Sequence, residues 1–415
     1  MKPSLGSLLL CLGSPLAAQT TWVVPNQADL TPYIAQANPG DTLLLGAYHT
    51  GFVLDKGLTL RPQSGRTQVY FNLFGPYPQS STTSVQTPAG QRSLLVDIDF
   101  LTTGPMWQGD LGTGHPVTAS GTTSFERCTF STLGSGGHAL TTNGNVTLRH
   151  CSATTSFGSI GLGVQGGTCS AVRCQFTGAN AASSLGMNDF YATPGVRITS
   201  GTFVASHCTM TPGAAQLGVA FAIPLGPTSG LLVSGGTAHL TDCTISGGHF
   251  PSGWPAIPGP YEGAPAIWAP GGSATHARCT LLPGDGGFGV PPPAPTLGNA
   301  SVDGNLVGID SSGPLLLGTT WTATAKAGDS GQLLGFGLSF GLSPSTLPFV
   351  PEPLWMDPAT AILAGFSTPA AGAAIPAAIA IPNVVSLVGA ELWCQALQLD
   401  GSLVRVSPLV GGVVR

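Results

Sequence analysis

Charged residues are scarce in this 415-residue chain. Asp, Glu, Lys and Arg together make up 7% of it, whereas a typical soluble domain holds about 25%. The formal net charge is only −5, so the sequence offers no basic surface for nucleic acid. Beyond the N-terminal segment, no uninterrupted apolar run reaches the roughly 18 residues that a membrane-spanning helix needs. A nucleic-acid-binding protein and a helical membrane protein are both disfavoured.

Glycine and proline are abundant instead. The chain holds 60 Gly and 36 Pro, a composition that can indicate disorder. However, 42% of the residues are hydrophobic, and Val, Leu, Ile and Phe recur in short, regular runs. This pattern predicts many short strands joined by turns, and therefore an all-β protein.

The N-terminus has the pattern of a secretory signal peptide. Lys2 gives a charged start, residues 5–16 form a short apolar stretch, and Ala17 and Ala18 are the small residues expected at a cleavage site. A short buried helix is the alternative. We expect residues 1–18 to be removed and the mature protein to be secreted or held at the cell surface.

One motif recurs six times: a glycine followed seven residues later by a cysteine. The residues two and four after the glycine are mostly apolar, which indicates a strand with these positions inward. The residue six after it is charged or a histidine, and we expect the chain to bend there and turn this residue outward. The cysteine then points inward again. The six cysteines are Cys128, Cys151, Cys174, Cys208, Cys243 and Cys279.

The spacing of the motif predicts a solenoid. Successive cysteines are 23, 23, 34, 35 and 36 residues apart, which is typical of stacked coils that bury their apolar faces against each other. With coils about 4.7–4.9 Å apart, the cysteines should form one internal column. Because their Cβ vectors would be parallel, we expect mostly free thiols.

A third strand precedes each glycine, and its outer face is the candidate binding surface. The residues four before the glycine should point outward: Val117, Leu140, Gly163, Arg197, Leu232 and Trp268. The extra residues of the long coils all fall just before this strand, at about 101–115, 177–194, 211–229 and 246–264. Insertions at one point of every coil lie on one flank, so we expect them to wall a groove along the third strand.

The repeat resembles the right-handed parallel β-helix family, whose members are pectate-lyase-like. Residues 34–60 are also similar to the opening of many such proteins, and the resemblance covers about residues 20–288. It implies a carbohydrate site on the third-strand face. Lyases of this family hold calcium with clustered carboxylates and use an arginine as base, and its hydrolases use grouped aspartates. The outward third-strand positions here hold no Asp or Glu, so no catalytic residue and no calcium site is transferred.

Several residues near this face are candidates for a site, although each also has a structural explanation. Those that could take part in catalysis are Arg197, Asp189, Asp110 and Glu262. Those that could contact a substrate are Trp268, Trp254, Tyr261, His138, His115 and Arg197. His115 and His138 lack a third ligand, so we expect no metal and no cofactor. A row of basic corner residues (Arg127, His150, Arg173 and His207) could attract an acidic polymer or could be a solvated edge.

The C-terminal part differs in pattern. Residues 289–300 are Pro-rich and are interpreted as a linker between a β-helix (19–288) and a second domain (301–415). Alternating apolar residues in the second domain predict a small antiparallel β-sandwich. Residues 381–400 are similar to C-terminal modules of secreted bacterial surface proteins, which implies a role in export or attachment.

The combined expectation is an exported, non-catalytic β-helix surface protein that binds extracellular polysaccharide or the cell envelope in the groove. A polysaccharide lyase or glycoside hydrolase that acts on an extracellular glycan is the main alternative. A purely structural envelope or adhesion protein is the third.

Overall fold

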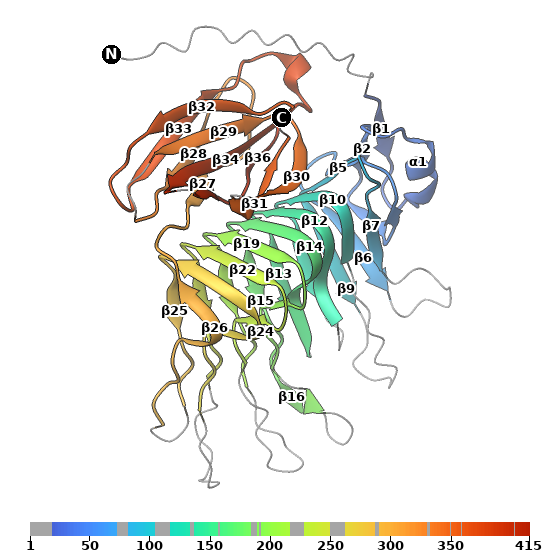
Figure 1. Cartoon of the computed structure of the whole chain (residues 1–415). Coiled ribbons are helices and arrows are strands. Elements are labelled where there is room, and N and C mark those ends of the chain that lie inside the picture. Colours follow the sequence, from blue (N-terminus) through green and yellow to red (C-terminus); the bar gives the residue numbers. More distant parts are fainter. Residues whose placement is uncertain are drawn as a thin grey trace.

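The computed structural model describes residues 19–72, 82–103, 117–132, 137–156, 158–183, 189–190, 192–215, 228–249, 262–286, 290–329, 333–348, 350–357, 359–401 and 403–415. The expected signal peptide lies outside these ranges. Within them the chain is nearly all-β, as predicted, with one short α-helix, α1 (Thr31–Gln36), and one 3-10 helix, η1 (Val385–Leu387). Long parallel sheets come first and antiparallel sheets follow (Figure 1).

Two parallel sheets build the first part of the molecule. The larger contains β1 (Thr21–Val24), β2 (Thr42–Leu45), β4 (Val53–Leu54), β5 (Thr59–Pro62), β7 (Thr83–Gln86), β8 (Ser93–Val96), β10 (Val117–Glu126), β12 (Gly137–Arg149), β14 (Ser159–Val172), β18 (Val196–Ile198), β19 (Thr202–Ser206), β21 (Leu231–Val233), β22 (Thr237–Thr241), β24 (Ile267–Ala277) and β26 (Thr296–Val302). The second contains β3 (Tyr48–Thr50), β6 (Thr67–Asn72), β9 (Ile98–Thr103), β11 (Thr129–Thr132), β13 (Ser152–Thr155), β15 (Gln175–Thr177), β20 (Thr209–Thr211), β23 (Thr244–Ser246) and β25 (Thr280–Leu282). A separate antiparallel pair, β16 (Ala182–Ser183) and β17 (Asp189–Phe190), lies within one connection.

Successive coils stack in register, in the manner of a β-helix-like solenoid. The position two after the repeat glycine forms one continuous column of paired residues: Thr123, Val146, Cys169, Phe203, Ala238 and Ala274. The residues four positions after the repeat glycine form a second column, and the side chains of both columns are buried. One hydrophobic core runs through the stack. The predicted inward faces of this strand are confirmed.

Each predicted bend consists of a single residue in the left-handed region. These corner residues have φ angles of 50–54°: Asp97, Arg127, His150, Arg173, His207, Asp242 and Arg278. We call them the corner column. A residue with a Cβ atom adopts this conformation at a cost of about 1–2 kcal/mol, so the bend is held by the stacked ladders on both sides. Backbone hydrogen bonds continue through it, as in Arg127 N–H to Arg149 O at 2.8 Å.

The cysteines lie directly after the corner column, on the inner side, and all are free thiols. Each thiol donates to the carbonyl two residues earlier, across the bend; for Cys151 and Arg149 O the distance is 3.3 Å. Several also donate to the preceding coil, as Cys151 does to Phe125 O at 3.4 Å. A small, buried side chain with a weak donor suits this place, which explains the recurrence of cysteine.

The third strand differs from the expectation in the first two repeats. Val117 and Leu140 were expected to face outward but are fully buried in the core. The register shifts between Thr142 and Asn143, because the next coil has one extra residue, Gln165, before its glycine. Since side chains alternate along a strand, this single insertion reverses the inward and outward positions.

The Pro-rich segment also differs from the expectation. Residues 289–300 were interpreted as a linker, but β26 begins at Thr296 and pairs in parallel with β24. The stack therefore continues by one further strand. Strands β14, β18, β21, β24, β22 and β19 form a closed ring of pairings. The ring arises because β14 and β24 are long, bend, and each pair with two shorter strands.

The C-terminal domain is antiparallel throughout its described part. One sheet holds β27 (Gly308–Ser311), β28 (Thr320–Lys326) and β33 (Ala374–Ala380). Another holds β29 (Leu334–Ser339), β32 (Ile362–Ser367), β34 (Glu391–Asp400), β35 (Leu403–Val406) and β36 (Val410–Val413), and β30 (Leu342–Leu347) pairs with β31 (Val350–Met356). Their shared core contains Trp321, Phe336 and Cys394.

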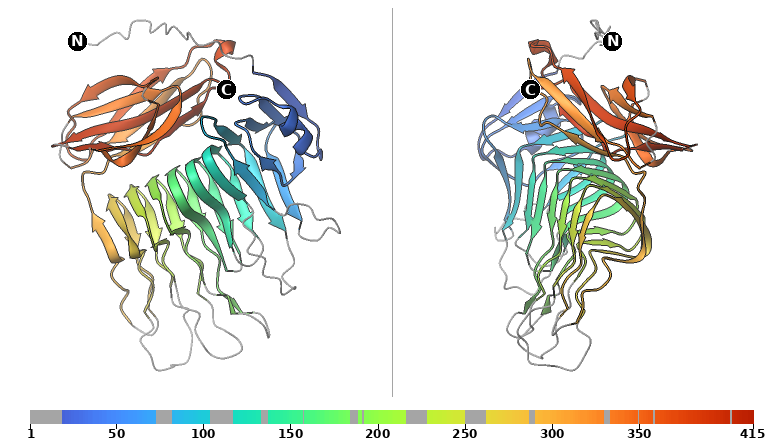
Figure 2. Two further views of the ribbon diagram at one scale, coloured as in Figure 1. Left: turned by 45° about the vertical axis from the view of Figure 1, so that its right-hand side comes forward. Right: turned by 90° about the vertical axis from the view of Figure 1, so that its left-hand side faces the viewer.

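This domain lies lengthwise along the stack of coils, and not beyond its end (Figure 2). It covers the outer face of the sheet between the repeat glycines and the corner column. Outward side chains there are buried in every coil, among them Leu94, Glu126, Arg149, Val172 and Val204. Val172 belongs to the core of the C-terminal domain, and Leu409 N–H donates to Ser170 Oγ at 3.2 Å.

Candidate functional site

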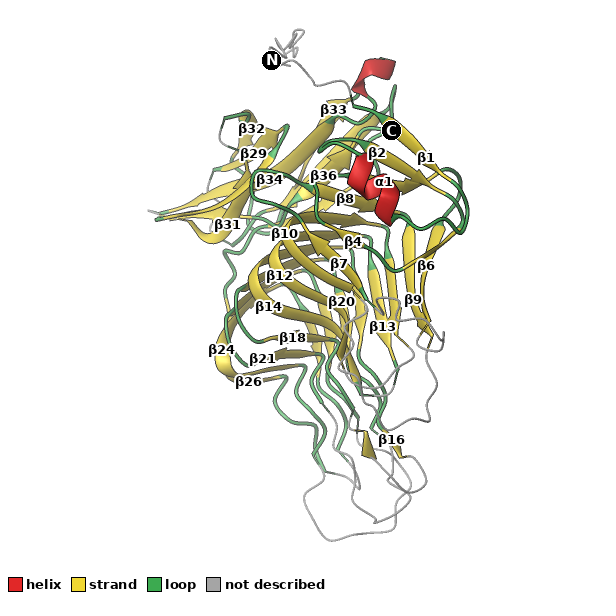
Figure 3. Ribbon diagram, turned by 90° about the vertical axis from the view of Figure 1, so that its right-hand side faces the viewer, coloured by secondary structure: helices red, strands yellow, loops and turns green. Residues whose placement is uncertain are grey.

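The open part of the third-strand face carries a short column of large side chains. Arg197, Leu232, Trp268 and Leu297 occupy paired positions in four consecutive coils. Arg197 is exposed, Trp268 is 41% exposed and Leu297 is 54% exposed. We call this set the third-strand column. Its strands β18, β21, β24 and β26 are labelled on one side of the stack in Figure 3.

The sequence around each of these residues fixes its orientation. Val196 and Ile198 flank Arg197 and are fully buried, and Ile267 and Ala269 do the same for Trp268. Alternation along the strand then forces the residue between them outward. Arg197 on β18 and Trp268 on β24 are therefore presented from strands of one ladder, with β21 between them.

A second group lies next to Arg197, towards the N-terminal coils. The His138 ring occupies the space above Gly163, because a Cβ on Gly163 would come within 2.5 Å of the ring. His138 and Thr141 are largely buried. The Thr141 hydroxyl has no hydrogen-bond partner within the described ranges. Since Gly163 pairs with Arg197, the His138 ring lies over the coil that is next to the coil of Arg197.

The other predicted site residues are not brought to this column by the described structure. Asp110, His115, Trp254 and Tyr261 lie outside the described residues. Asp189 belongs to the short strand β17, of which only the backbone is described. Glu262 is exposed in the connection that leads to β24.

The described third-strand face carries groups that can contact a ligand. It offers one permanent cation, an indole ring, two leucines and hydroxyl groups, and its outward described positions hold no carboxylate. An acid and base pair, which glycoside hydrolysis needs, is not formed by these residues. Within the described ranges, no group of three or more His, Cys, Asp or Glu is placed to hold a metal ion.

The described ends of the long connections gather at one corner of the coils, before the third strand. Gly178 N–H bonds to Thr211 O, and Ala181 N–H bonds to Ala214 O at 2.8 Å. These bonds join equivalent positions of successive connections. The expected placement of the insertions at one flank is confirmed for their bases, and β16 lies on the side away from the C-terminal domain (Figure 1).

The corner column, by contrast, is partly covered. The C-terminal domain contacts it through ion pairs: Arg173 with Asp310, Asp242 with Lys326 at 2.8 Å, and Arg415 with Asp97 at 3.3 Å. Of the four residues of the basic row, Arg127 pairs with Asp97 and Arg173 pairs with Asp310, whereas Arg173 and His207 remain exposed. The row is therefore partly paired and partly solvated.

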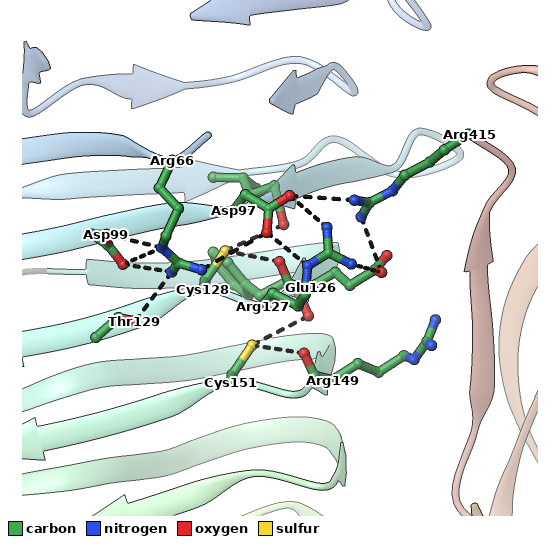
Figure 4. Close-up of polar contacts among 12 residues, drawn as sticks. Arg66, Asp97, Asp99, Glu126, Arg127, Cys128, Thr129, Arg149, Cys151 and Arg415 are labelled. Atoms are coloured by element: carbon green, nitrogen blue, oxygen red, sulfur yellow. Dashed lines mark hydrogen bonds and ion pairs between the residues drawn. The ribbon is translucent and has the colours of Figure 1, made fainter. Parts of the chain in front are cut away.

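The densest part of this contact surrounds Asp97 and Glu126 (Figure 4). Arg127 donates to Asp97 at 2.7 Å and to Glu126 at 2.8 Å, and Arg415 reaches Glu126 at 3.0 Å. Burial raises the pKa of the nearby Cys128 thiol well above its ordinary value, so it stays protonated. Burial and the charges of Arg149 and Arg173 lower the pKa of His150. Because Arg415 pairs with Asp97 and Glu126, this cluster connects the C-terminal domain to the coils.

The C-terminal domain also contains an apolar pocket of about 270 Å³. It lies between the sheet of β29 and the β30–β31 pair and is lined by Gly337, Leu347, Val350, Leu354, Met356, Ala361, Ile362, Leu363, Leu397, Val404 and Val406. Ligand sites usually combine an apolar lining with a few polar groups that orient the ligand. This lining lacks them, so the third-strand column remains the better candidate.

Comparison with known protein families, with curated proteins and with solved structures finds no match for this chain. The resemblance drawn from the sequence therefore rests on the repeat and its coil geometry alone. None of the helices in the described ranges has the length and apolar character that crossing a membrane requires.

Proposed function

We propose that this chain is an exported right-handed parallel β-helix protein with a small C-terminal β-sandwich. In this proposal it binds an extracellular polysaccharide along the third-strand face and does not cleave it. Localisation is the cell surface or the surrounding medium, after loss of residues 1–18.

The observation that carries the proposal is the third-strand column. Aromatic faces stack on the apolar faces of sugar rings, and Trp268 is held on a strand that cannot swing away. Arg197, two coils from Trp268, can donate several hydrogen bonds to hydroxyl or acidic groups. A row of such groups at coil spacing suits an extended polymer better than a single small molecule.

The proposal is tested by measuring retention of the purified chain on a panel of immobilised polysaccharides. Replacing Trp268 with Ala should weaken binding to the retained polysaccharide about tenfold, because one stacking contact of about 1.4 kcal/mol is lost. Tyr48→Ala is the matched control. Tyr48 is an exposed aromatic residue, 43% accessible, on β3 of the other sheet, and its loss should leave binding unchanged.

Two outcomes would contradict the proposal. One is a wild-type chain that no polysaccharide retains, which would favour a purely structural protein. The other is release of reducing or unsaturated sugars by the wild-type chain with loss of turnover in Arg197→Ala, which would favour the lyase or hydrolase alternative.

A further inference from the structure

Arg149 is a buried arginine at the contact between the coils and the C-terminal domain. It ends β12, whose pairing with β10 and β14 fixes its backbone. The residue is 3% exposed. Its guanidinium lies against Gly412 of β36, because a Cβ on Gly412 would come within 2.6 Å of Nη1.

Two of the three nitrogen atoms of this guanidinium lack partners in the part of the chain that the structure describes. Among the described residues, neither Nε nor Nη2 of Arg149 has a hydrogen-bond partner. The nearest acidic residue, Glu126, already binds Arg127 and Arg415. In Figure 4 the only dashed line to Arg149 reaches its carbonyl, and the guanidinium points away from the cluster towards the C-terminal domain.

The charges around Arg149 do not balance. Four guanidinium groups lie near three side-chain carboxylates in this cluster. The cations are Arg66, Arg127, Arg149 and Arg415, and the anions are Asp97, Asp99 and Glu126. Burial lowers the pKa of Arg149, but arginine stays protonated in proteins. A buried charge is normally paired, and among the described side chains Arg149 has no carboxylate of its own.

We propose that Arg149 binds a small inorganic anion, of the size and charge of chloride, through Nε and Nη2. The anion completes the charge balance and lies between the sheet of coils and β36. Because Gly412 carries no side chain, the guanidinium can approach the backbone of β36 closely. The burial of Arg149 excludes a polymer, so this site is independent of the third-strand column.

The experiment measures thermal unfolding of the full chain at constant ionic strength while chloride replaces gluconate. Binding to the folded state alone stabilises it by mass action. We expect a saturable rise of the unfolding midpoint by about 2–4 °C. In Arg149→Met the rise should disappear, because the binding group is gone. Crystals soaked in bromide should show an anomalous peak beside Nε and Nη2 of Arg149.

Arg173→Met is the matched control, because Arg173 lies at the same contact but is paired with Asp310. This variant should lose stability and keep the chloride response. A midpoint that does not depend on chloride, or one that responds equally in Arg149→Met, would overturn the proposal. If Arg149→Met does not fold, the bromide peak decides, and its absence from wild-type crystals would overturn the proposal as well.

Discussion

At the scale of single residues, the cysteine after each corner does two things at once. Its sulfur fills space inside the coil, and its thiol shares a carbonyl that already accepts a ladder bond. Arg149 O, for example, accepts both Arg127 N–H and the Cys151 thiol. Burial raises the pKa of Cys174 and Cys243 well above the ordinary value. These two thiols therefore stay protonated and serve as packing groups.

Replacing Cys174 with Ala should lower the free energy of unfolding by about 1–2 kcal/mol, because a small cavity forms and a weak hydrogen bond is lost. Urea titration of the full chain measures this. Cys279→Ala is the control, since Cys279 lies at the end of the column and is only partly buried; its loss should be smaller. Equal losses would show that the column is not a packed unit.

At the scale of elements, the sheet face below the C-terminal domain holds a histidine that must stay neutral. His239 on β22 bonds Thr275 Oγ1 at 2.9 Å. Burial, together with the nearby charge of Arg405, lowers its pKa to about 4, compared with about 6.5 in an unfolded chain. Between these values the unfolded chain binds the extra proton, so stability falls as the pH falls from 6.5 towards 4.

We expect the free energy of unfolding to be about 1–3 kcal/mol lower at pH 4.5 than at pH 7 through this residue alone. The measurement is urea unfolding at both pH values for the wild type and for His239→Asn, which cannot titrate. The variant should show a smaller difference between the two pH values than the wild type. An identical pH dependence in both chains would contradict the assignment.

The same scale shows how far sequence reasoning reaches. The inward columns and the corner column were predictable, because each coil repeats the same local pattern of apolar and charged residues. The burial of Val117 and Leu140 was not predictable, because the extra residue Gln165 reverses the inward and outward positions and nothing in the repeat pattern indicates this. β26 was missed because prolines before Thr296 suggested a linker, although the strand itself begins after the last of them.

At the scale of the whole molecule, the charged contacts between the coils and the C-terminal domain were hidden from the sequence. Arg173 and Asp310 are 137 positions apart, and nothing periodic connects them. The candidate site was partly predictable: Arg197 and Trp268 were identified from their outward positions, whereas Leu297 was not, because its strand was not foreseen. Local repetition can be read directly, but docking between domains depends on contacts distant in sequence.

Asp242 is a buried charged residue whose loss should weaken this contact. Its side chain is 7% exposed and pairs with both Arg278 and Lys326. Asp242→Asn keeps the shape but leaves two cations without their partner, which should cost about 3–5 kcal/mol. Calorimetry or urea unfolding measures this. Asp99→Asn is the control, because its partner Arg66 is 40% exposed and such a pair contributes at most about 1 kcal/mol.

The lengthwise position of the C-terminal domain changes how the stack of coils can come apart. A bare solenoid can fray one winding at a time from either end, because each winding touches only its neighbours. Here Arg415 reaches Asp97 in an early winding and Lys326 reaches Asp242 in a late one. The C-terminal domain thus connects early and late windings. Pulling on the molecule or cutting one winding should therefore be resisted by the whole stack and not by a single winding.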